Sequence, residues 1–356
     1  YSESGIARVY SVPDFSEVDE FLFDAPRLLF LQRDDVSFFV TGVAAVEKLE
    51  TRRLGEHPVL LTRIPKLPWG QFDLDASGST VVFSPSSQRT RVYQQSLVDS
   101  ELPPRLVAEH TKRVRVLIDP QGRWVATQER KGLTVRLWSL ESDAPEELTS
   151  IEVEQFLGRW QFDTAGNLMV QADLVDGSPL ALVWDLRLPS GAEPMTLRSR
   201  KAPEYINGVS IDPSGRWVAA GGVNEIPFWS LPEDSPVVFA GDRKIVYELE
   251  FASDGKALVV PRGFSRLESL PLVKDRQRKI LLEEPVMGVS ASEGDGTILA
   301  TANFPARVFV FRPGDPEPTI LEGFDDSVNI FHVAYEPERQ LVAAAVKKGP
   351  AEHKVI

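Results

Sequence analysis

The stretch Ile118-Asp119-Pro120-Gln121-Gly122-Arg123-Trp124-Val125-Ala126-Thr127 decides how the rest of the chain is interpreted. It returns almost letter for letter as Ile211-Asp212-Pro213-Ser214-Gly215-Arg216-Trp217-Val218-Ala219-Ala220. In each copy an apolar strand end leads into an Asp-Pro-x-Gly turn and then into an apolar run. Proline pre-sets φ for the turn and glycine accepts a positive φ, so the pattern predicts a β-hairpin. A hairpin that occurs twice indicates a repeat.

The glycine of this turn can be followed along the chain. Related turns lie 40 to 49 residues apart and carry Gly78, Gly122, Gly166, Gly215, Gly255 and Gly296. Two degenerate units, with turns near Ala25 and Pro337, bring the number of hairpins to eight. A third strand with an aromatic residue near its end and a short fourth strand are expected after the hairpins. Four strands in about 40–45 residues is the period of a propeller blade.

We therefore predict an all-β fold, a β-propeller of eight four-stranded blades. Seven blades are the alternative, because the first unit is weak. The N-terminal run 6–12 should supply the outer strand of the last blade, which would close the ring and leave no open edge. Residues 1–356 would form this single domain, in units of residues 14–60, 66–110, 111–151, 152–199, 203–241, 243–284, 285–324, and 326–356 together with 6–12.

Composition limits the classes of function. The net charge of −13 argues against a basic nucleic-acid-binding surface, and no nucleic-acid partner is expected. The absence of cysteine excludes disulfides and cysteine-ligated zinc, and it suits a reducing compartment. No apolar run approaches the roughly 18 residues of a membrane span. We expect a cytoplasmic protein, and the Tyr1 start suggests a piece of a longer one.

The sequence Val183-Trp184-Asp185-Leu186 is a Trp-Asp strand ending, and Leu137-Trp138-Ser139-Leu140 and Phe228-Trp229-Ser230-Leu231 are related to it. With these endings and its period, the chain resembles the WD40-repeat family. It departs from the family at the Gly-His dipeptide, which only the segments ending in His57 and His110 approach. We expect no complete His–Ser/Thr–Trp–Asp network in any blade. The resemblance implies a binding platform linked to or associated with an effector domain.

Residues of catalytic type are interpreted as structural. The histidines lack metal-site spacing, and no Gly-x-Ser-x-Gly serine motif occurs. Aspartates recur at one point of the repeat, where the carboxylate can accept backbone N–H bonds: Asp75, Asp119, Asp163 and Asp212. Arg123 and Arg216 could contact anions, but we interpret them as charged strand starts beside a tryptophan.

In a propeller, the loops that lead into the innermost strands line one face around the channel. By the repeat register these positions include Lys112, Tyr205, Asn207, Tyr247 and Phe331, our partner-binding candidates. Burial of the aromatics between blades is the structural alternative. We predict a non-catalytic scaffold for a protein or peptide, without a cofactor. The alternatives are a propeller hydrolase or lactonase with a carboxylate or metal site at the channel mouth, and a propeller that gates an adjacent hydrolase domain.

Overall fold

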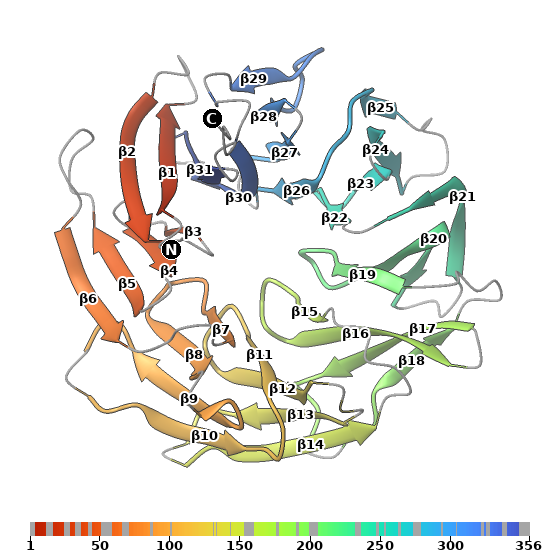
Figure 1. The fold of residues 1–356 in the computed structure, drawn as a ribbon. Coiled ribbons are helices and arrows are strands. Elements are labelled where there is room, and N and C mark those ends of the chain that lie inside the picture. The colour runs from red at the N-terminus through yellow and green to blue at the C-terminus, as the bar shows by residue number, and fades with distance from the viewer. Residues whose placement is uncertain are drawn as a thin grey trace, which may run out of the picture. The chain divides into compact units, whose positions relative to one another are not determined.

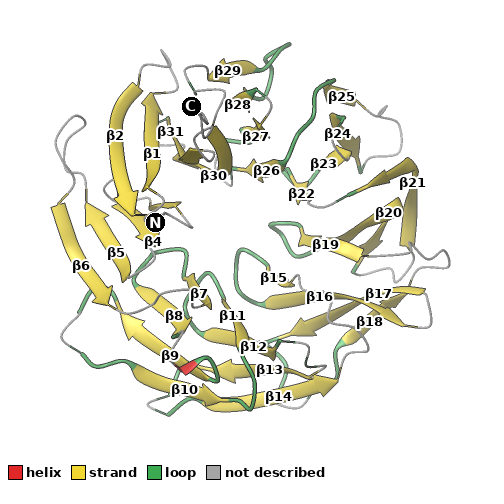
Figure 2. Cartoon of the chain, in the orientation of Figure 1, coloured by secondary structure: helices red, strands yellow, loops and turns green. Residues whose placement is uncertain are grey.

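A computed structural model describes the residues 4–11, 17–24, 29–32, 37–41, 45–50, 59–65, 71–85, 88–99, 102–130, 132, 134–142, 144–152, 160–175, 178–189, 192–198, 206–231, 236–246, 249–252, 254–262, 265–272, 279–292, 295–303, 305–321, 324, 328–336 and 340–348. For part of them, including all before residue 66, only the backbone is described. Figure 2 shows antiparallel strands with almost no helix, so the expected all-β class is confirmed. Within these ranges no helix is long and apolar enough to cross a membrane.

The chain divides into two compact units. Unit 1 consists of Tyr1–Pro68, Phe264–Leu267 and Ile280–Ile356, and unit 2 consists of Trp69–Gly263 and Glu268–Lys279.

Unit 2 contains successive antiparallel sheets, each built from strands that are consecutive in the chain (Figure 1). The sheets and their strands are β7 Gln71–Leu74, β8 Thr80–Ser84, β9 Arg91–Ser96 and β10 Arg105–Glu109; β11 Val114–Ile118, β12 Trp124–Glu129, β13 Thr134–Ser139 and β14 Glu146–Glu152; β15 Trp160–Phe162, β16 Leu168–Val175, β17 Ser178–Asp185 and β18 Met195–Arg198; β19 Ile206–Ile211, β20 Trp217–Ser230 and β21 Pro236–Ile245. A further sheet consists of β22 Glu250–Phe251, β23 Ala257–Arg262, β24 Arg266–Pro271 and β25 Lys279–Leu282. Its first two strands belong to unit 2, whereas β24 and β25 each have residues in both units.

Unit 1 repeats this plan and contains both ends of the described chain. Its sheets are β3 Leu29–Gln32, β4 Ser37–Thr41, β5 Ala45–Glu50 and β6 Val59–Pro65; β26 Gly288–Ala291, β27 Ile298–Asn303, β28 Ala306–Phe311 and β29 Thr319–Leu321; and a sheet of order β2-β1-β31-β30, with β1 Ser4–Ser11, β2 Glu17–Asp24, β30 Val328–Glu336 and β31 Leu341–Lys348. The N-terminal strand thus pairs with the last hairpin, from Gly5 opposite Lys347 to Ser11 opposite Leu341.

The strand arrangement differs from the prediction at the N-terminal end of the described chain. The strand Glu17–Asp24 was expected to begin the first unit, but it pairs with β1 and forms an edge of the sheet that contains β31. The run 6–12, expected as the outer strand of that sheet, instead lies mainly in the inner strand β1, which pairs with β2 on one side and β31 on the other.

The sheet β19-β20-β21 contains both strands expected at 217–220 and 226–229 within one element, β20, which folds back on itself. The N–H of Leu231 donates to the carbonyl of Arg216 at 2.8 Å, and the Trp217 and Phe228 rings lie 5.5 Å apart.

The predicted turn is confirmed in both copies of the opening motif. Gly122 has a φ of 73° and Gly215 one of 68°. The Oδ1 atom of the buried Asp119 accepts the backbone N–H groups of Arg123 and Trp124, at 2.5 and 2.7 Å. Asp212 accepts the equivalent two N–H groups of its own turn, at 2.5 and 2.6 Å. The recurring aspartate therefore closes the turn and positions the start of the following strand.

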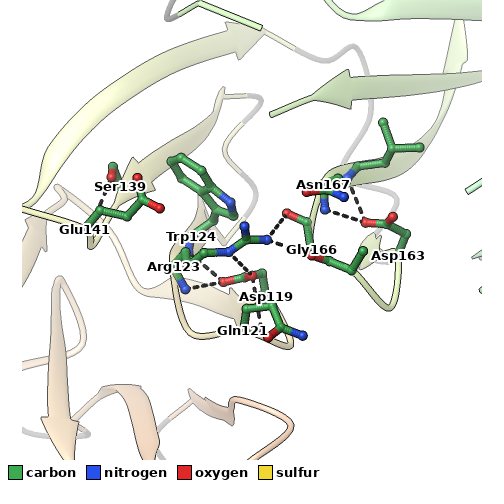
Figure 3. A network of polar contacts seen from close by, with 11 residues as sticks. Asp119, Gln121, Arg123, Trp124, Ser139, Glu141, Asp163, Gly166 and Asn167 are labelled. Atoms are coloured by element: carbon green, nitrogen blue, oxygen red, sulfur yellow. Dashed lines mark hydrogen bonds and ion pairs between the residues drawn. The ribbon is translucent and has the colours of Figure 1, made fainter. Parts of the chain in front are cut away.

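Successive turns also contact one another (Figure 3). The guanidinium Nη2 of Arg123 donates to the carbonyl oxygens of Ala165 and Gly166, at 2.7 and 3.0 Å, in the turn of the next sheet. Its Nε lies 3.4 Å from Asp119 Oδ2, and its guanidinium lies over the Trp124 ring. The interpretation of Arg123 as a structural residue beside a tryptophan is confirmed.

Apolar side chains fill the spaces between consecutive sheets of unit 2. Alternate residues of one strand serve opposite faces: Val125 packs toward the preceding sheet and Ala126 toward the following one. The same division separates Met169 from Val170 in β16. The sheets β11–β14 and β15–β18 are therefore buried on both faces, which is why their strands are rich in apolar residues.

The contacts between turns predict unequal effects for two equivalent glycines. Gly122→Ala would place Cβ in ordinary contact with Asp75, at 3.6 Å, so it should cost about 1–2 kcal/mol through positive φ alone. Gly166→Ala would overlap the Asp119 carboxylate and approach Arg123 Nη2 to 2.8 Å. Disrupting these charged hydrogen bonds should add about 1.5–3 kcal/mol. Urea unfolding of both variants measures the difference, and equal losses would contradict a role for contact between turns.

Candidate functional site

A cavity of about 390 Å³ lies in unit 2 along the first strands of five successive sheets. The strands β7, β11, β15, β19 and β22 each contribute to its wall, through Gln71, Arg115, Val116, Leu117, Trp160, Gln161, Val209 and Glu250. All these residues lie two to four positions before the first residue of their turn. The cavity therefore lies at the ends of the first strands, next to the turns.

Polar side chains connect these first strands to one another. Asp73 Oδ2 in β7 accepts the N–H of Ile118 in β11 at 2.9 Å. In the same way, Gln161 Oε1 in β15 accepts the N–H of Ile211 in β19 at 3.2 Å. These bonds satisfy backbone donors at the first edge of each sheet, where no further strand is available to accept them.

The wall of the cavity combines charge, hydrogen-bonding groups and an aromatic ring. Arg115 and Glu250 carry opposite charges, while Gln71 and Gln161 carry neutral amides. Ser210 Oγ donates to Glu250 Oε2 at 3.5 Å. The indole Nε1 of Trp160 is buried and has no hydrogen-bond partner among the described residues. Such a wall suits a ligand with both polar and apolar parts rather than a simple ion.

The loop before β11 contains the candidate Lys112, whose side chain is exposed. Its neighbour Thr111 donates through both backbone N–H and Oγ1 to Glu129 Oε1, at 2.7 and 2.9 Å, which holds the loop to the end of β12. The side chain of His110 is buried, and its Nδ1 lies 3.9 Å from Oε1 of the same carboxylate. Desolvation and the charge of Arg136 lower the pKa of His110 to about 4, so its imidazole is neutral at pH 7.

Beside this loop, a hydrogen bond connects a tryptophan to a threonine. Trp138 Nε1 donates to Thr127 Oγ1 at 2.9 Å, which joins β13 to β12. Neither ring nitrogen of His110 has a hydrogen-bond partner among the described residues. The tryptophan and threonine are therefore connected here without the histidine.

The other partner-binding candidates are described less fully. Asn207 and Phe331 lie at β-bulges in β19 and β30, where the pairing register shifts. Each stands five residues before the first residue of its turn, so the bulge recurs at an equivalent position in the two units. Tyr205 and Tyr247 lie outside the described residues. Lys112 lies in the loop before β11, and Asn207 lies in β19. Both of these strands contribute residues to the cavity wall.

The cavity residues themselves were missed by the sequence reasoning. A signal was present for two of them, because polar residues recur two positions before the first turn residue, at Asp73, Gln161, Ser210 and Glu250. Of these four, Gln161 and Glu250 line the cavity. Within the described residues, no group of three or more histidine, aspartate or glutamate side chains could hold a metal ion.

The comparisons with known proteins add no family assignment. No model of a known family matches the chain, and a search of curated proteins finds no similar sequence.

The carboxyl group of Asp73 predicts a pH dependence of stability. Burial raises its pKa from 3.8 to about 7, the hydrogen bonds from the Ile118 and Leu74 N–H groups oppose this, and the charge of Asp75 adds to it. At a pH between these two pKa values, Asp73 is protonated in the folded protein and ionised in the unfolded chain. The free energy of unfolding should therefore fall as pH rises from 4 to 7, by about 1.4 kcal/mol per tenfold difference in proton affinity.

Asp73→Asn removes this titration but keeps an oxygen for the Ile118 N–H. The variant should gain stability over the natural protein above pH 7 and show a flatter profile between pH 4 and 7. Urea unfolding at a series of pH values measures both. Gln161→Glu places a carboxyl group at the equivalent position in β15. This variant should therefore lose stability more steeply than the natural protein as pH rises. A parallel profile for Asp73→Asn and the natural protein would show that Asp73 titrates normally.

Proposed function

We propose that this chain is a non-catalytic binding module and that its cavity in unit 2 receives part of a protein or peptide. The observation that carries the proposal is the shared cavity wall, to which five successive sheets contribute. Arginine and tryptophan, present as Arg115 and Trp160, are the side chains most often found at energetically dominant contacts of interfaces. A cavity of about 390 Å³ holds a few side chains of a partner rather than a folded domain.

As part of this proposal, the sheets are the blades of an eight-bladed propeller that resembles WD40 proteins. Support comes from the recurring hairpin, the interleaved apolar layers of unit 2 and the pairing of β1 with β31. In this arrangement the first strands would line the central channel, and the pairing of the N-terminal strand would close the ring.

The rim of the site is formed, in this proposal, by the loops before the first strands. Lys112 stands three residues before Arg115, and Asn207 stands two before Val209. A partner that reaches the cavity from the side of these loops would pass both residues. Tyr205, Tyr247 and Phe331 are proposed for the same rim by their place in the repeat.

Peptides selected on the full chain from a random library test this function. Arg115→Glu reverses a charge in the cavity wall and should weaken binding by about tenfold or more. Lys112→Glu, at the rim, should have a smaller effect that added salt reduces. Lys279→Glu reverses a charge on the exposed strand β25 and serves as the matched control. Fluorescence anisotropy gives the dissociation constants.

Thermal unfolding of each variant separates lost binding from lost structure. Trp160→Phe keeps an aromatic ring in the cavity wall and serves as a second variant if Arg115→Glu does not fold. Equal affinities for the natural protein and a folded cavity variant would place the binding surface elsewhere.

A further inference from the structure

Buried polar atoms without partners gather between the sheets β11–β14 and β15–β18. Gln171 in β16 is fully buried, and neither its Nε2 nor its Oε1 has a hydrogen-bond partner among the described residues. Gln128 in β12 is also fully buried; its Nε2 donates to Gly132 O at 3.3 Å, while its Oε1 has no such partner. The Trp160 Nε1 donor completes the set.

The strand register places these groups on facing surfaces. Gln171 is directly opposite Trp160 in the β15–β16 pair, and Gln128 is directly opposite Arg115 in the β11–β12 pair. Side chains of directly opposed residues share one face of a sheet, with Cβ atoms about 4.5–5.5 Å apart. Met169 and Ala126 lie on the same faces as Gln171 and Gln128, and both belong to the core between these two sheets.

This polar set adjoins the cavity. Arg115 and Trp160 belong to the cavity wall, and each is the cross-strand neighbour of one buried glutamine. Polar groups therefore continue from the cavity wall into the space between the sheets, next to an otherwise apolar cluster. A cavity beside unsatisfied donors and acceptors can admit a ligand group that completes their hydrogen bonds.

In the preceding sheet, the position equivalent to Gln171 carries a polar side chain that does have a hydrogen-bond partner. Thr127 stands eight residues after Asp119, as Gln171 does after Asp163. Thr127 is satisfied, because Trp138 Nε1 donates to its Oγ1. A buried amide without partners destabilises a core, whereas an apolar side chain of similar size would not. The longer glutamine thus supplies hydrogen-bonding capacity that the fold itself does not use.

We propose that the cavity binds a neutral carboxamide group, which inserts between Arg115 and Trp160 and pairs with Gln171. The amide carbonyl would accept from Trp160 Nε1–H or Gln171 Nε2–H, and the amide N–H would donate to Gln171 Oε1 or Gln128 Oε1. The unsatisfied set contains both donors and acceptors and no charge, which matches an amide better than a carboxylate or an ammonium group. The source could be a small amide or an Asn or Gln side chain of a peptide, and for the peptide source the inference rests on the proposed function.

The test follows the indole N–H signal of Trp160 in the ¹⁵N-labelled full chain, assigned by its loss in Trp160→Phe. Acetamide should shift this signal in a saturable way, and acetate should not. Gln171→Met should weaken acetamide binding by about tenfold or more while it keeps the fold, because methionine has a similar size and no amide. Gln95→Met is the matched control, since Gln95 also has a buried Oε1 without a described partner but lies in β9.

A capped peptide with a central Gln, compared with the same peptide with norleucine, distinguishes the peptide source from the free amide. Stronger binding of the Gln peptide supports the peptide source. The absence of a saturable shift with acetamide, or an equal shift in folded Gln171→Met, would overturn the inference and leave ordered water as the occupant. If selected peptides lose affinity with Arg115→Glu but not with Gln171→Met, the proposed function stands and the amide inference falls.

Discussion

The structure depends on a buried aspartate that accepts two backbone N–H bonds within one turn. In this way Asp119 and Asp212 each hold the last residue before the following strand and the first residue of that strand. A buried carboxylate is costly unless its oxygens are satisfied, and here the backbone donors of the turn satisfy them. The positive φ of the glycine completes the turn, so both residues are needed in each copy.

The turn also connects one sheet to the next. Arg123 joins its own aspartate to the carbonyl groups at Ala165 and Gly166, and the backbone N–H of Ala76 donates to the carbonyl of Pro120 at 2.9 Å. Because these turns are in contact, the first strands β7, β11 and β15 end next to one another. This arrangement explains why residues as distant in sequence as Gln71 and Glu250 contribute to one cavity.

Two kinds of polar group occur in the first two strands of these sheets. Asp73 and Gln161 accept N–H groups from the neighbouring first strand, and their role is to join sheets. Gln171 and the Trp160 indole have no such partner among the described residues, although they lie beside the cavity. The contrast separates polar groups that hold the fold from polar groups that are available to a ligand.

The sequence alone determined the all-β class, the turns and the structural role of the recurring aspartates, because these depend on residues within a few positions of one another. It predicted that the N-terminal run would pair with the last unit, but not that Glu17–Asp24 would join the same sheet through β1, because the turn near Ala25 was assigned to a hairpin of the first unit. The candidates Lys112 and Asn207 lie on or before strands of the cavity wall, yet the wall residues were not predicted. Only the tertiary structure showed which polar side chains remain unsatisfied, because burial and partner choice depend on how neighbouring sheets pack.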